Sequence, residues 1–492
     1  MAALRDCAAN VENEIDADSS AAEPLLQRQN SHDERPPEDA SEAPSPWRPS
    51  RATRVPMMVY LVLLMALLEL EESVQSVPTV RLYESAVCQQ YYKDKVSEDK
   101  CKTKKIQQTL AHVRGWQGLF DALPTLLLSI PFGCLADAKG RRLVLFLSEF
   151  GEICRLGWIL MTCMLWDKLP ISIVWLSSLF RFIGGGPNVS FAVLLSMVAD
   201  ISTSETRSRT FYFMFCTMLC VGVFGPILAA VTLGHSLWLP YLICATSLAA
   251  SFPILYLMPE TLHDSSKQQK LIFHTVDVSL NPFRWLRGSI KSSLEIYKAA
   301  VNDRRMVAGL FCVFLAQFKS ATTDILPPYI SYKFHWPLSK TAVLITVIYS
   351  VNVVLYLVVL PYTTTYLKRV TKRPTTSIDL LVSRTSLALL SAGVFIVGFA
   401  NSIGFMFLGL AIFAAGFGAR LSMLSVLTGF TSAEFRARLY TLLSIIEELT
   451  RLISTPLIQN LWAKAVASDG VLLGLPFIVL GVSLLLYVVD YR

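Results

Sequence analysis

Ionisable side chains inside long apolar runs are the residues of this sequence with the clearest chemical potential. Glu149, Glu152 and Arg155 lie in the apolar run 142–165, and Arg181 lies in the run 171–198. A charge in apolar surroundings is costly, so such residues mark functional sites by default. Glu152 and Arg155 are one helical turn apart and can neutralise each other, which leaves Glu149 without a partner in its own segment.

Two kinds of chemistry fit these positions. A buried carboxyl at Glu149 can take up and release a proton, and the alternative is a hydrogen bond that only holds helices together. Arg181 stays charged at physiological pH, so it can stabilise a nearby carboxylate, hold an anionic substrate or form a static ion pair. Asp121 and Glu69, in the runs 114–136 and 55–76, are further carboxyl candidates for proton coupling.

The second half of the chain offers a similar set. Lys319 and Arg420 lie in the runs 306–326 and 403–430, and Glu447 and Arg451 lie in the run 437–462. The i, i+4 spacing of Glu447 and Arg451 favours a pair within one helix. Arg420 would then lack a partner, which makes it, with Lys319, a candidate for lining a substrate cavity.

The amino-acid composition indicates which type of secondary structure positions these residues. Of 492 residues, 53% are apolar and only 16% are charged, whereas soluble domains carry about 25% charged residues. A membrane-spanning helix needs about 20 apolar residues, and the long continuous runs argue against a barrel, whose strands alternate over about 10 residues. We therefore predict an all-α integral membrane protein with twelve transmembrane helices in two six-helix bundles. The predicted runs are 55–76, 114–136, 142–165, 171–198, 210–233, 237–258, 306–326, 341–362, 379–400, 403–430, 437–462 and 470–489.

Polar segments divide the chain into four parts. Residues 1–54 are rich in Ser, Pro, Asp and Glu, which predicts a disordered cytosolic tail. The bundles would cover 55–259 and 306–492, joined by a central cytosolic loop at 260–305 that includes a short amphipathic helix. Basic residues fall in alternate loops, with the mixed-charge loop at about 77–113 as the one exception, so both termini are expected in the cytosol, at the plasma or vacuolar membrane.

The cysteines and the missing motifs narrow the chemistry further. Cys88 and Cys101 share a polar loop expected to face away from the cytosol, where an oxidising compartment would let them form a disulfide. No metal-site spacing, phosphate-binding loop or serine-hydrolase elbow is present, so we expect no metal, no cofactor and no enzyme activity. The formal charge of +7 is spread over the loops and does not indicate nucleic-acid binding. The expected partners are a small-molecule substrate and the lipid bilayer, with the chain a monomer.

The junction at residues 133–142 carries the most specific motif. Gly133 permits close helix approach, Gly140 permits a tight turn, and Asp137 can accept hydrogen bonds from Arg141, Arg142 or a helix N-terminus. An acid there can latch two bundles on the cytosolic side. The string GCLADAKGRR resembles the G-x-L-a-D-x-x-G-R-[RK] signature of the major facilitator superfamily.

Other segments are similar to the same superfamily. Residues 181–186 (RFIGGG) resemble a motif of proton-coupled members, and 222–226 (GVFGP) resemble the antiporter signature without its later glycines. Residues 81–84, 130–133 and 329–336 resemble a fungal branch, and the proton-coupled folate carriers are distantly similar. The resemblance implies a major facilitator fold and a secondary transporter that moves a small organic molecule by alternating access, with a central cavity. The alternative is a membrane nutrient sensor of the same fold. The antiporter-like motif favours export, while Arg181, Lys319 and Arg420 would suit an anionic cargo.

Overall fold

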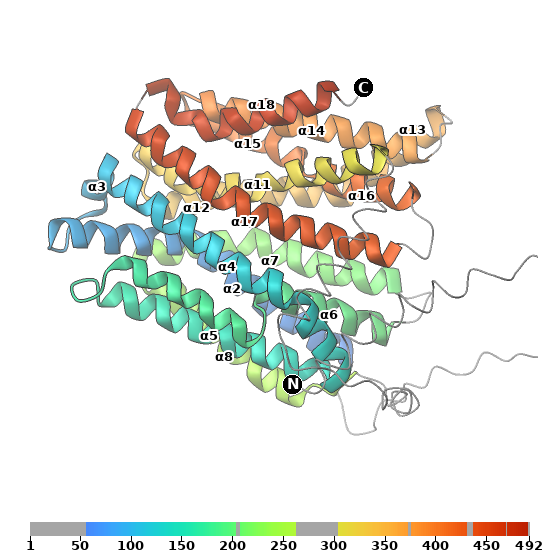
Figure 1. Ribbon diagram of the computed structural model, residues 1–492, viewed down its shortest axis with the longest axis horizontal. Helices are drawn as coiled ribbons and strands as arrows, with labels where there is room; N and C mark the ends of the chain where they lie inside the picture. Colours follow the sequence, from blue (N-terminus) through green and yellow to red (C-terminus); the bar gives the residue numbers. More distant parts are fainter. Residues whose placement is uncertain are drawn as a thin grey trace, which may run out of the picture.

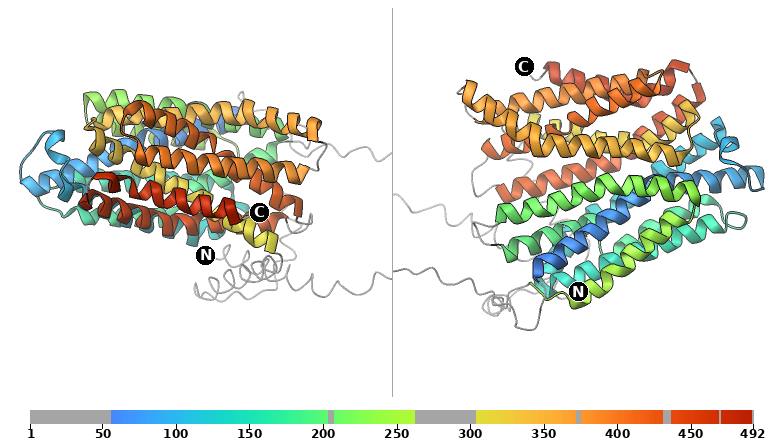
Figure 2. Two further views of the ribbon diagram at one scale, coloured as in Figure 1. Left: turned by 90° about the horizontal axis from the view of Figure 1, so that it is seen from above. Right: turned by 180° about the vertical axis from the view of Figure 1, so that it is seen from behind.

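The computed structural model describes residues 56–202, 207–261, 304–371, 375–430, 436–468 and 470–490. Within these ranges the secondary structure is helical, without strands. The helices run side by side in two groups, with the first half of the chain below and the second half above in Figure 1. Figure 2 shows the same division from behind. The predicted tail at 1–54 and the central amphipathic helix lie outside the described residues.

The first group comprises the helices up to residue 257. Its members are α2 (Met57–Tyr92), α3 (Glu98–Cys101), α4 (Lys104–Lys139), α5 (Arg141–Met164), the 3₁₀ helix η1 (Ile171–Ile183), α6 (Pro187–Ile201), α7 (Arg207–His235) and α8 (Leu239–Leu257).

The second group begins at residue 304. Its members are α11 (Arg304–Phe334), α12 (Leu338–Val354), the π-helical turn η3 (Leu355–Val359), α13 (Leu360–Thr371), α14 (Thr375–Phe399), α15 (Ile403–Ala415), α16 (Gly418–Phe430), α17 (Arg436–Ser468), the 3₁₀ turn η5 (Gly470–Gly474) and α18 (Leu475–Asp490).

Each predicted apolar run falls on a helix or on consecutive helices, but several boundaries were wrong. The helix α2 continues to Tyr92, past the predicted end at 76, and α4 begins at Lys104, before the predicted start at 114. These extensions are helical although polar, because they are buried against other parts of the protein: Tyr83 and Glu84 are each 2% exposed.

Among the residues that the structure describes, seven helical segments are long and apolar enough to cross a membrane. They are Ile171–Ile201, Phe213–His235, Leu239–Leu257, Met306–Phe334, Leu338–Thr371, Thr376–Phe399 and Ile403–Gly429. The remaining predicted runs lie on α18, which is short, and on α2, α4, α5 and α17, which carry ionisable residues. Large apolar side chains such as Phe224, Tyr256 and Leu486 are exposed on the outer surface, as expected for contact with lipid.

The buried apolar side chains show where the two groups join. One cluster extends over both groups and includes Tyr83 and Leu110 together with Tyr329 and Trp462. A second cluster, which includes Met57, Val144 and Met258, belongs to the first group alone. The groups are therefore packed together near α3, an end that we call the α3 end. At the opposite end, where α4 meets α5, the first group has its own core, and we call this the junction end.

A disulfide fixes the loop at the α3 end. Cys88 near the end of α2 is bonded to Cys101 in α3. The structure thus contains the disulfide expected from the shared polar loop, and it ties the short helix α3 to the long helix α2.

Candidate functional site

A cavity of about 250 Å³ lies between the two groups of helices. The first group lines it through α2, α4, α5, η1 and α6, and the second group contributes residues of α11 and α17. Its uncharged polar lining consists of Gln75, Ser76, Thr79, Gln117, Thr455 and Gln459. The ionisable residues on one side of this cavity form a connected set.

Two arginines share one carboxylate at the centre of that set. The Nε of Arg155 donates to Glu152 Oε2 at 2.5 Å, which is the pair that their spacing predicted. The Nε of Arg181 lies 3.2 Å from Glu152 Oε1, and its Nη1 lies 3.8 Å from Asp121 Oδ2. The Nη2 of Arg155 donates to Gln75 Oε1 at 2.8 Å. The network therefore connects α2, α4, α5 and η1.

Asp121 is held from two helices. Gln117, one turn earlier in α4, donates its Nε2 to Asp121 Oδ1 at 3.0 Å. The hydroxyl of Ser178 in η1 donates to the same oxygen at 2.5 Å. Together with the Arg181 contact, these bonds fix the position of the Asp121 carboxyl group.

Glu149 is buried and only half satisfied. Its side chain is 2% exposed, and the hydroxyl of Ser190 in α6 donates to its Oε1 at 3.2 Å. Its Oε2 has no hydrogen-bond partner. Arg181 contacts Glu152 and Asp121, and not Glu149, so the nearby carboxylates that it can stabilise are those two.

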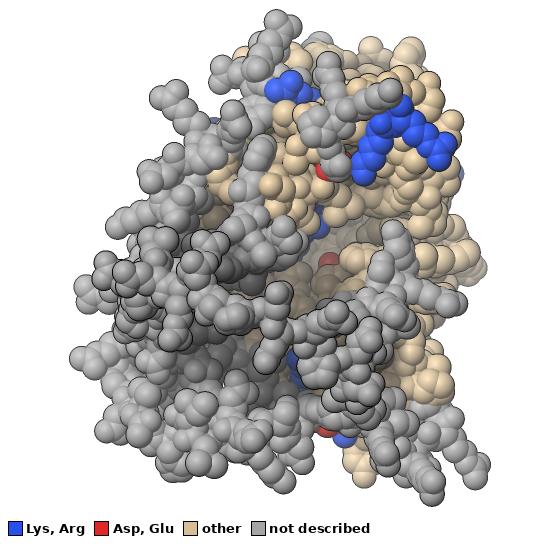
Figure 3. Space-filling view, turned by 90° about the vertical axis from the view of Figure 1, so that its right-hand side faces the viewer, with Lys and Arg blue, Asp and Glu red and all other residues tan. Residues whose placement is uncertain are grey.

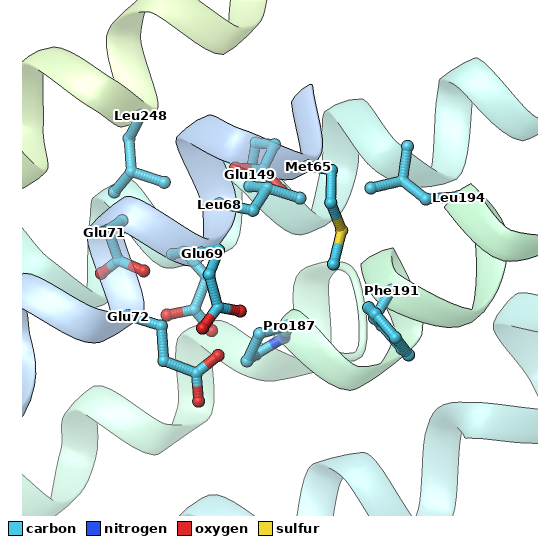
Figure 4. A pocket seen from close by; sticks show the side chains of 11 residues that line it. Met65, Leu68, Glu69, Glu71, Glu72, Glu149, Pro187, Phe191, Leu194 and Leu248 are labelled. Carbon is cyan, nitrogen blue, oxygen red and sulfur yellow. The ribbon is translucent and has the colours of Figure 1, made fainter. Parts of the chain in front are cut away.

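A smaller cavity of about 40 Å³ adjoins the first and is rich in carboxyl groups (Figure 4). Its ionisable lining consists of Glu69, Glu71, Glu72, Glu149 and Glu152. The sequence analysis singled out Glu69 in α2 but missed Glu71 and Glu72, which line both cavities. Both lie in the apolar run 55–76, so the same criterion, an ionisable residue inside an apolar run, would have identified them.

The helix that carries Arg181 breaks beside these cavities. The 3₁₀ helix η1 ends at Ile183 and α6 begins at Pro187, with Gly185 and Gly186 at φ values of 83° and 80°. Side chains of neighbouring helices bond to backbone carbonyls at the break: Thr125 donates to Gly185 O at 3.4 Å, and Ser148 donates at 3.0 Å to Gly186 O, which also accepts backbone N–H groups of α6. A broken helix at membrane depth is tolerated where the backbone is buried in protein or lines a cavity. The fourth run of the second half is interrupted too, between α15 and α16.

The two cationic candidates of the second half lie elsewhere. Arg420 contacts Glu447 through its Nε at 2.5 Å and its Nη2 at 2.8 Å, so the expected pairing of Glu447 with Arg451 was wrong. Glu447 faces α16 across the helix interface rather than the next turn of α17. The Nζ of Lys319 lies 4.2 Å from the centre of the Phe417 ring. Neither cation lines the two cavities; the second half contributes Asp324, Thr455 and Gln459.

The junction motif is capped by an acid from outside it. Gly140 has a φ of 112°, which explains the glycine. The backbone N–H groups of Arg141 and Arg142 donate to Oε1 and Oε2 of Glu260 at 3.1 and 3.2 Å. A carboxylate at a helix N-terminus is stabilised by the free N–H groups and the helix dipole. Glu260 thus caps α5 in the way expected of Asp137, whose side chain lies outside the described residues.

The motif side chains also reach other helices. Arg141 forms an ion pair with Asp200 at the end of α6, and Arg142 Nη2 donates to Tyr256 O in α8 at 2.9 Å. Among the described residues, a Cβ at Gly133 would meet nothing within 4 Å, so none of these shows the expected close helix approach at this glycine.

The two ends of the molecule differ in how the groups meet. At the α3 end, the Nζ of Lys102 donates to Trp336 O at 3.1 Å, and Glu98 Oε1 accepts from the backbone N–H of Leu338 at 2.8 Å. These contacts join the loop at α3 to the connection between α11 and α12. The junction end, seen in Figure 3, is recessed between its described surfaces, and an acidic side chain is visible in the recess.

Residues 107–489, most of the chain, match the family model of the Major Facilitator Superfamily. The chain belongs to the major facilitator superfamily. This confirms the resemblance seen in the junction motif and the prediction of an all-α, multi-pass membrane protein.

Curated fungal members of the superfamily are similar over most of their length. The "MFS efflux pump atnC" of Emericella nidulans is 30% identical over 419 residues, which cover 82% of this chain and 80% of the relative. The "MFS transporter SAT21" of Stachybotrys chartarum is 28% identical over 425 residues, with 80% and 87% covered. The relatives place this superfamily member among fungal proteins of small-molecule membrane transport.

Solved structures share its fold. The human organic anion transporter MFSD10 (TETRAN) has a TM-score of 0.55 at 16% identity, with 89% of this chain and 99% of that chain covered. The xylose transporter XylE from E. coli, in a partially occluded inward open conformation, has a TM-score of 0.54 at 12% identity, with 88% and 97% covered. Among the described residues of this superfamily member, no group of His, Cys, Asp and Glu is arranged to hold a metal ion.

Proposed function

We propose that this superfamily member is a secondary transporter that exports a small organic molecule by alternating access, driven by proton movement. The observation that carries the proposal is a polar cavity lined by both halves of the chain, with a buried and half-satisfied carboxyl, Glu149, beside it. Twelve spans in two bundles, 55–259 and 306–492, would rock about this cavity. The efflux pump named among the fungal relatives supports the direction.

The orientation follows from the two ends. Basic residues such as Arg141 and Arg142 lie at the junction end, which supports a cytosolic location for that end and for both termini. The disulfide lies at the α3 end, which supports a location outside the cytosol. We place the protein in the plasma or vacuolar membrane on the same reasoning.

The coupling site is assigned to Glu149. Its unpartnered Oε2 lies in a buried pocket, where a carboxyl can hold a proton in one state and release it when the pocket opens. Arg181 and Asp121 belong to the adjoining network, which would rearrange as the bundles move. Residues 133–142, together with Glu260, would clamp the junction end when it closes.

Reconstituted vesicles with an imposed pH gradient test this function with a panel of small organic compounds. We expect gradient-driven transport of a compound by the wild type and its loss in Glu149→Gln, which keeps exchange of labelled for unlabelled substrate because exchange needs no net proton movement. Asp379→Asn is the matched control, since Asp379 is buried, binds Ser425 at 2.6 Å and lines neither cavity. An unchanged pH dependence in Glu149→Gln would contradict the coupling role.

A further inference from the structure

The smaller cavity contains carboxyl groups that the protein itself does not neutralise. Of its five glutamates, only Glu152 forms an ion pair with an arginine. Glu71 is 7% exposed and Glu149 is 2% exposed, yet Glu71 Oε1 and Glu149 Oε2 have no hydrogen-bond partner. Figure 4 shows the carboxyl groups of Glu69, Glu71 and Glu72 turned toward the same space. A buried carboxylate without a partner is costly, so each of these groups either holds a proton or pairs with a positively charged occupant of the pocket.

The two cavities together are acidic. The larger one adds Asp121 and Asp324 to the five glutamates, so the described lining holds seven carboxyl groups against three guanidinium groups. Those of Arg155 and Arg181 already contact carboxylates. Arg114 is the third, and its Nη1 has no hydrogen-bond partner. The excess of carboxyl groups disfavours the anionic cargo that the arginines suggested in the sequence.

The sizes of the two cavities indicate how an occupant would be placed. A small charged group fits the smaller cavity, and the rest of the molecule, its body, fits the larger one. The smaller cavity, about 40 Å³, exceeds the roughly 10–15 Å³ that one water molecule needs, and an ammonium group is of similar size. The larger cavity, about 250 Å³, adjoins it through Glu71, Glu72 and Glu152. It presents buried amide atoms without partners: Gln75 Nε2, Gln117 Oε1 and Gln459 Oε1. A body placed there would need hydrogen-bonding groups of its own.

We propose that the cargo is a polar organic amine whose protonated amino group sits at the carboxylate of Glu71, which lines both cavities. The body of the cargo lies in the larger cavity and bonds to the glutamine side chains there. This assignment rests on the proposed transport function, because it names the class of molecule that the same cavity carries.

Equilibrium binding to the full chain in lipid nanodiscs tests the assignment without any gradient. The probes are the N-acetyl and N-benzoyl derivatives of 1,4-diaminobutane, 4-aminobutan-1-ol and 4-aminobutanoate, which share one skeleton and end in an ammonium, a hydroxyl or a carboxylate. We expect at least one amine to bind about tenfold more tightly than its alcohol, and the carboxylates to bind most weakly. Glu71→Gln should remove the preference for the amine, while Glu71→Asp should keep part of it and Asp379→Asn all of it.

Three results would overturn the proposal. They are equal binding of amine and alcohol, an amine preference that survives in a folded Glu71→Gln, or no binding of either amine to the wild type. A melting curve of each variant shows whether it is folded, and Glu72→Gln provides a second variant at the same pocket if Glu71→Gln is not. Because binding is measured without a gradient, a failure here is distinguishable from a failure of proton-driven transport.

Discussion

Glu260 shows how a single side chain can hold together the helix ends at the junction. Its two carboxylate oxygens accept from the first two backbone N–H groups of α5, and a Cβ at Gly140 would lie 2.7 Å from its Oε2. The glycine is therefore required twice, for its positive φ and for the space that the carboxylate occupies. Since Glu260 follows α8, the cap also ties the end of that helix to the junction of α4 and α5.

Removing this cap should impair transport more than it impairs insertion. In Glu260→Ala two N–H groups lose their acceptor, and the loss of a helix cap costs about 0.5–2 kcal/mol. We expect a lower melting temperature and a several-fold fall in the transport rate, measured in vesicles at equal protein content. Asp167→Ala is the control, because Asp167 is exposed in the loop beyond the other end of α5. Wild-type transport by Glu260→Ala would show that the cap is only structural.

At the residue scale the sequence predicts pairs within one helix better than pairs between helices. The spacing of Glu152 and Arg155 indicated a contact that the structure contains. The spacing of Glu447 and Arg451 was equally favourable, but Glu447 contacts Arg420 of another helix. Spacing along one helix says which residues share a face, and it does not say which helix that face meets.

The helices show the same limit at the scale of elements. Apolar runs located the helices because lipid contact selects apolar side chains, and the polar extension of α2 was missed because it is buried in protein. The run 171–198 was predicted as one span, although Gly184, Gly185 and Gly186 precede Pro187 there. Such a cluster permits a break, but the hydroxyl of Thr125 that donates to the carbonyl of Gly185 at the break comes from another helix.

A close approach between the two groups of helices depends on a glycine. A Cβ at Gly118 in α4 would lie 2.3 Å from Cγ2 of Thr455 in α17, and one at Gly115 would lie 3.2 Å from Cβ of Gln459. Small residues let membrane helices approach closely and gain packing contacts. Gly118 and Thr455 also line the larger cavity, so the contact closes one wall of it.

A side chain at Gly118 should therefore separate α4 from α17. Overpacking of this kind costs about 1–3 kcal/mol, and we expect Gly118→Val to lower the melting temperature and the transport rate together. Gly118→Ala places a Cβ in the same clash with Thr455. Adding Thr455→Gly to Gly118→Ala should restore the melting temperature and the transport rate, because it removes the atoms that clash. Gly157→Val is the control, since a Cβ at Gly157 meets nothing within 4 Å. If Gly118→Val and Gly157→Val have the same melting temperature and transport rate, the contact between α4 and α17 at Gly118 determines neither quantity.

At the scale of the whole molecule, a few polar contacts add to the apolar core that joins the two halves at the α3 end. The side chain of Lys102 is 2% exposed and bonds to Trp336 O, and Glu98 binds both Leu338 N and, at 3.4 Å, Arg81 Nε. The disulfide fixes the loop that presents Lys102 and Glu98. Alternating access requires these contacts to break whenever the α3 end opens, so their strength sets how often the cavity faces that side.

Lys102→Met should accordingly expose the cavity to the α3 side, because methionine fills the space of the lysine stem and cannot donate to Trp336 O. The measurement is labelling of a reporter, Ser76→Cys in the cavity wall, by a membrane-impermeant thiol reagent added from that side, with the free cysteines replaced and the disulfide retained. We expect labelling several-fold faster than with Lys102 present. Lys100→Met, an exposed neighbour in α3, is the matched control and should leave the rate unchanged. Equal labelling of the two variants would mean that the apolar core shared by the two halves, rather than the polar contacts at α3, holds that end shut.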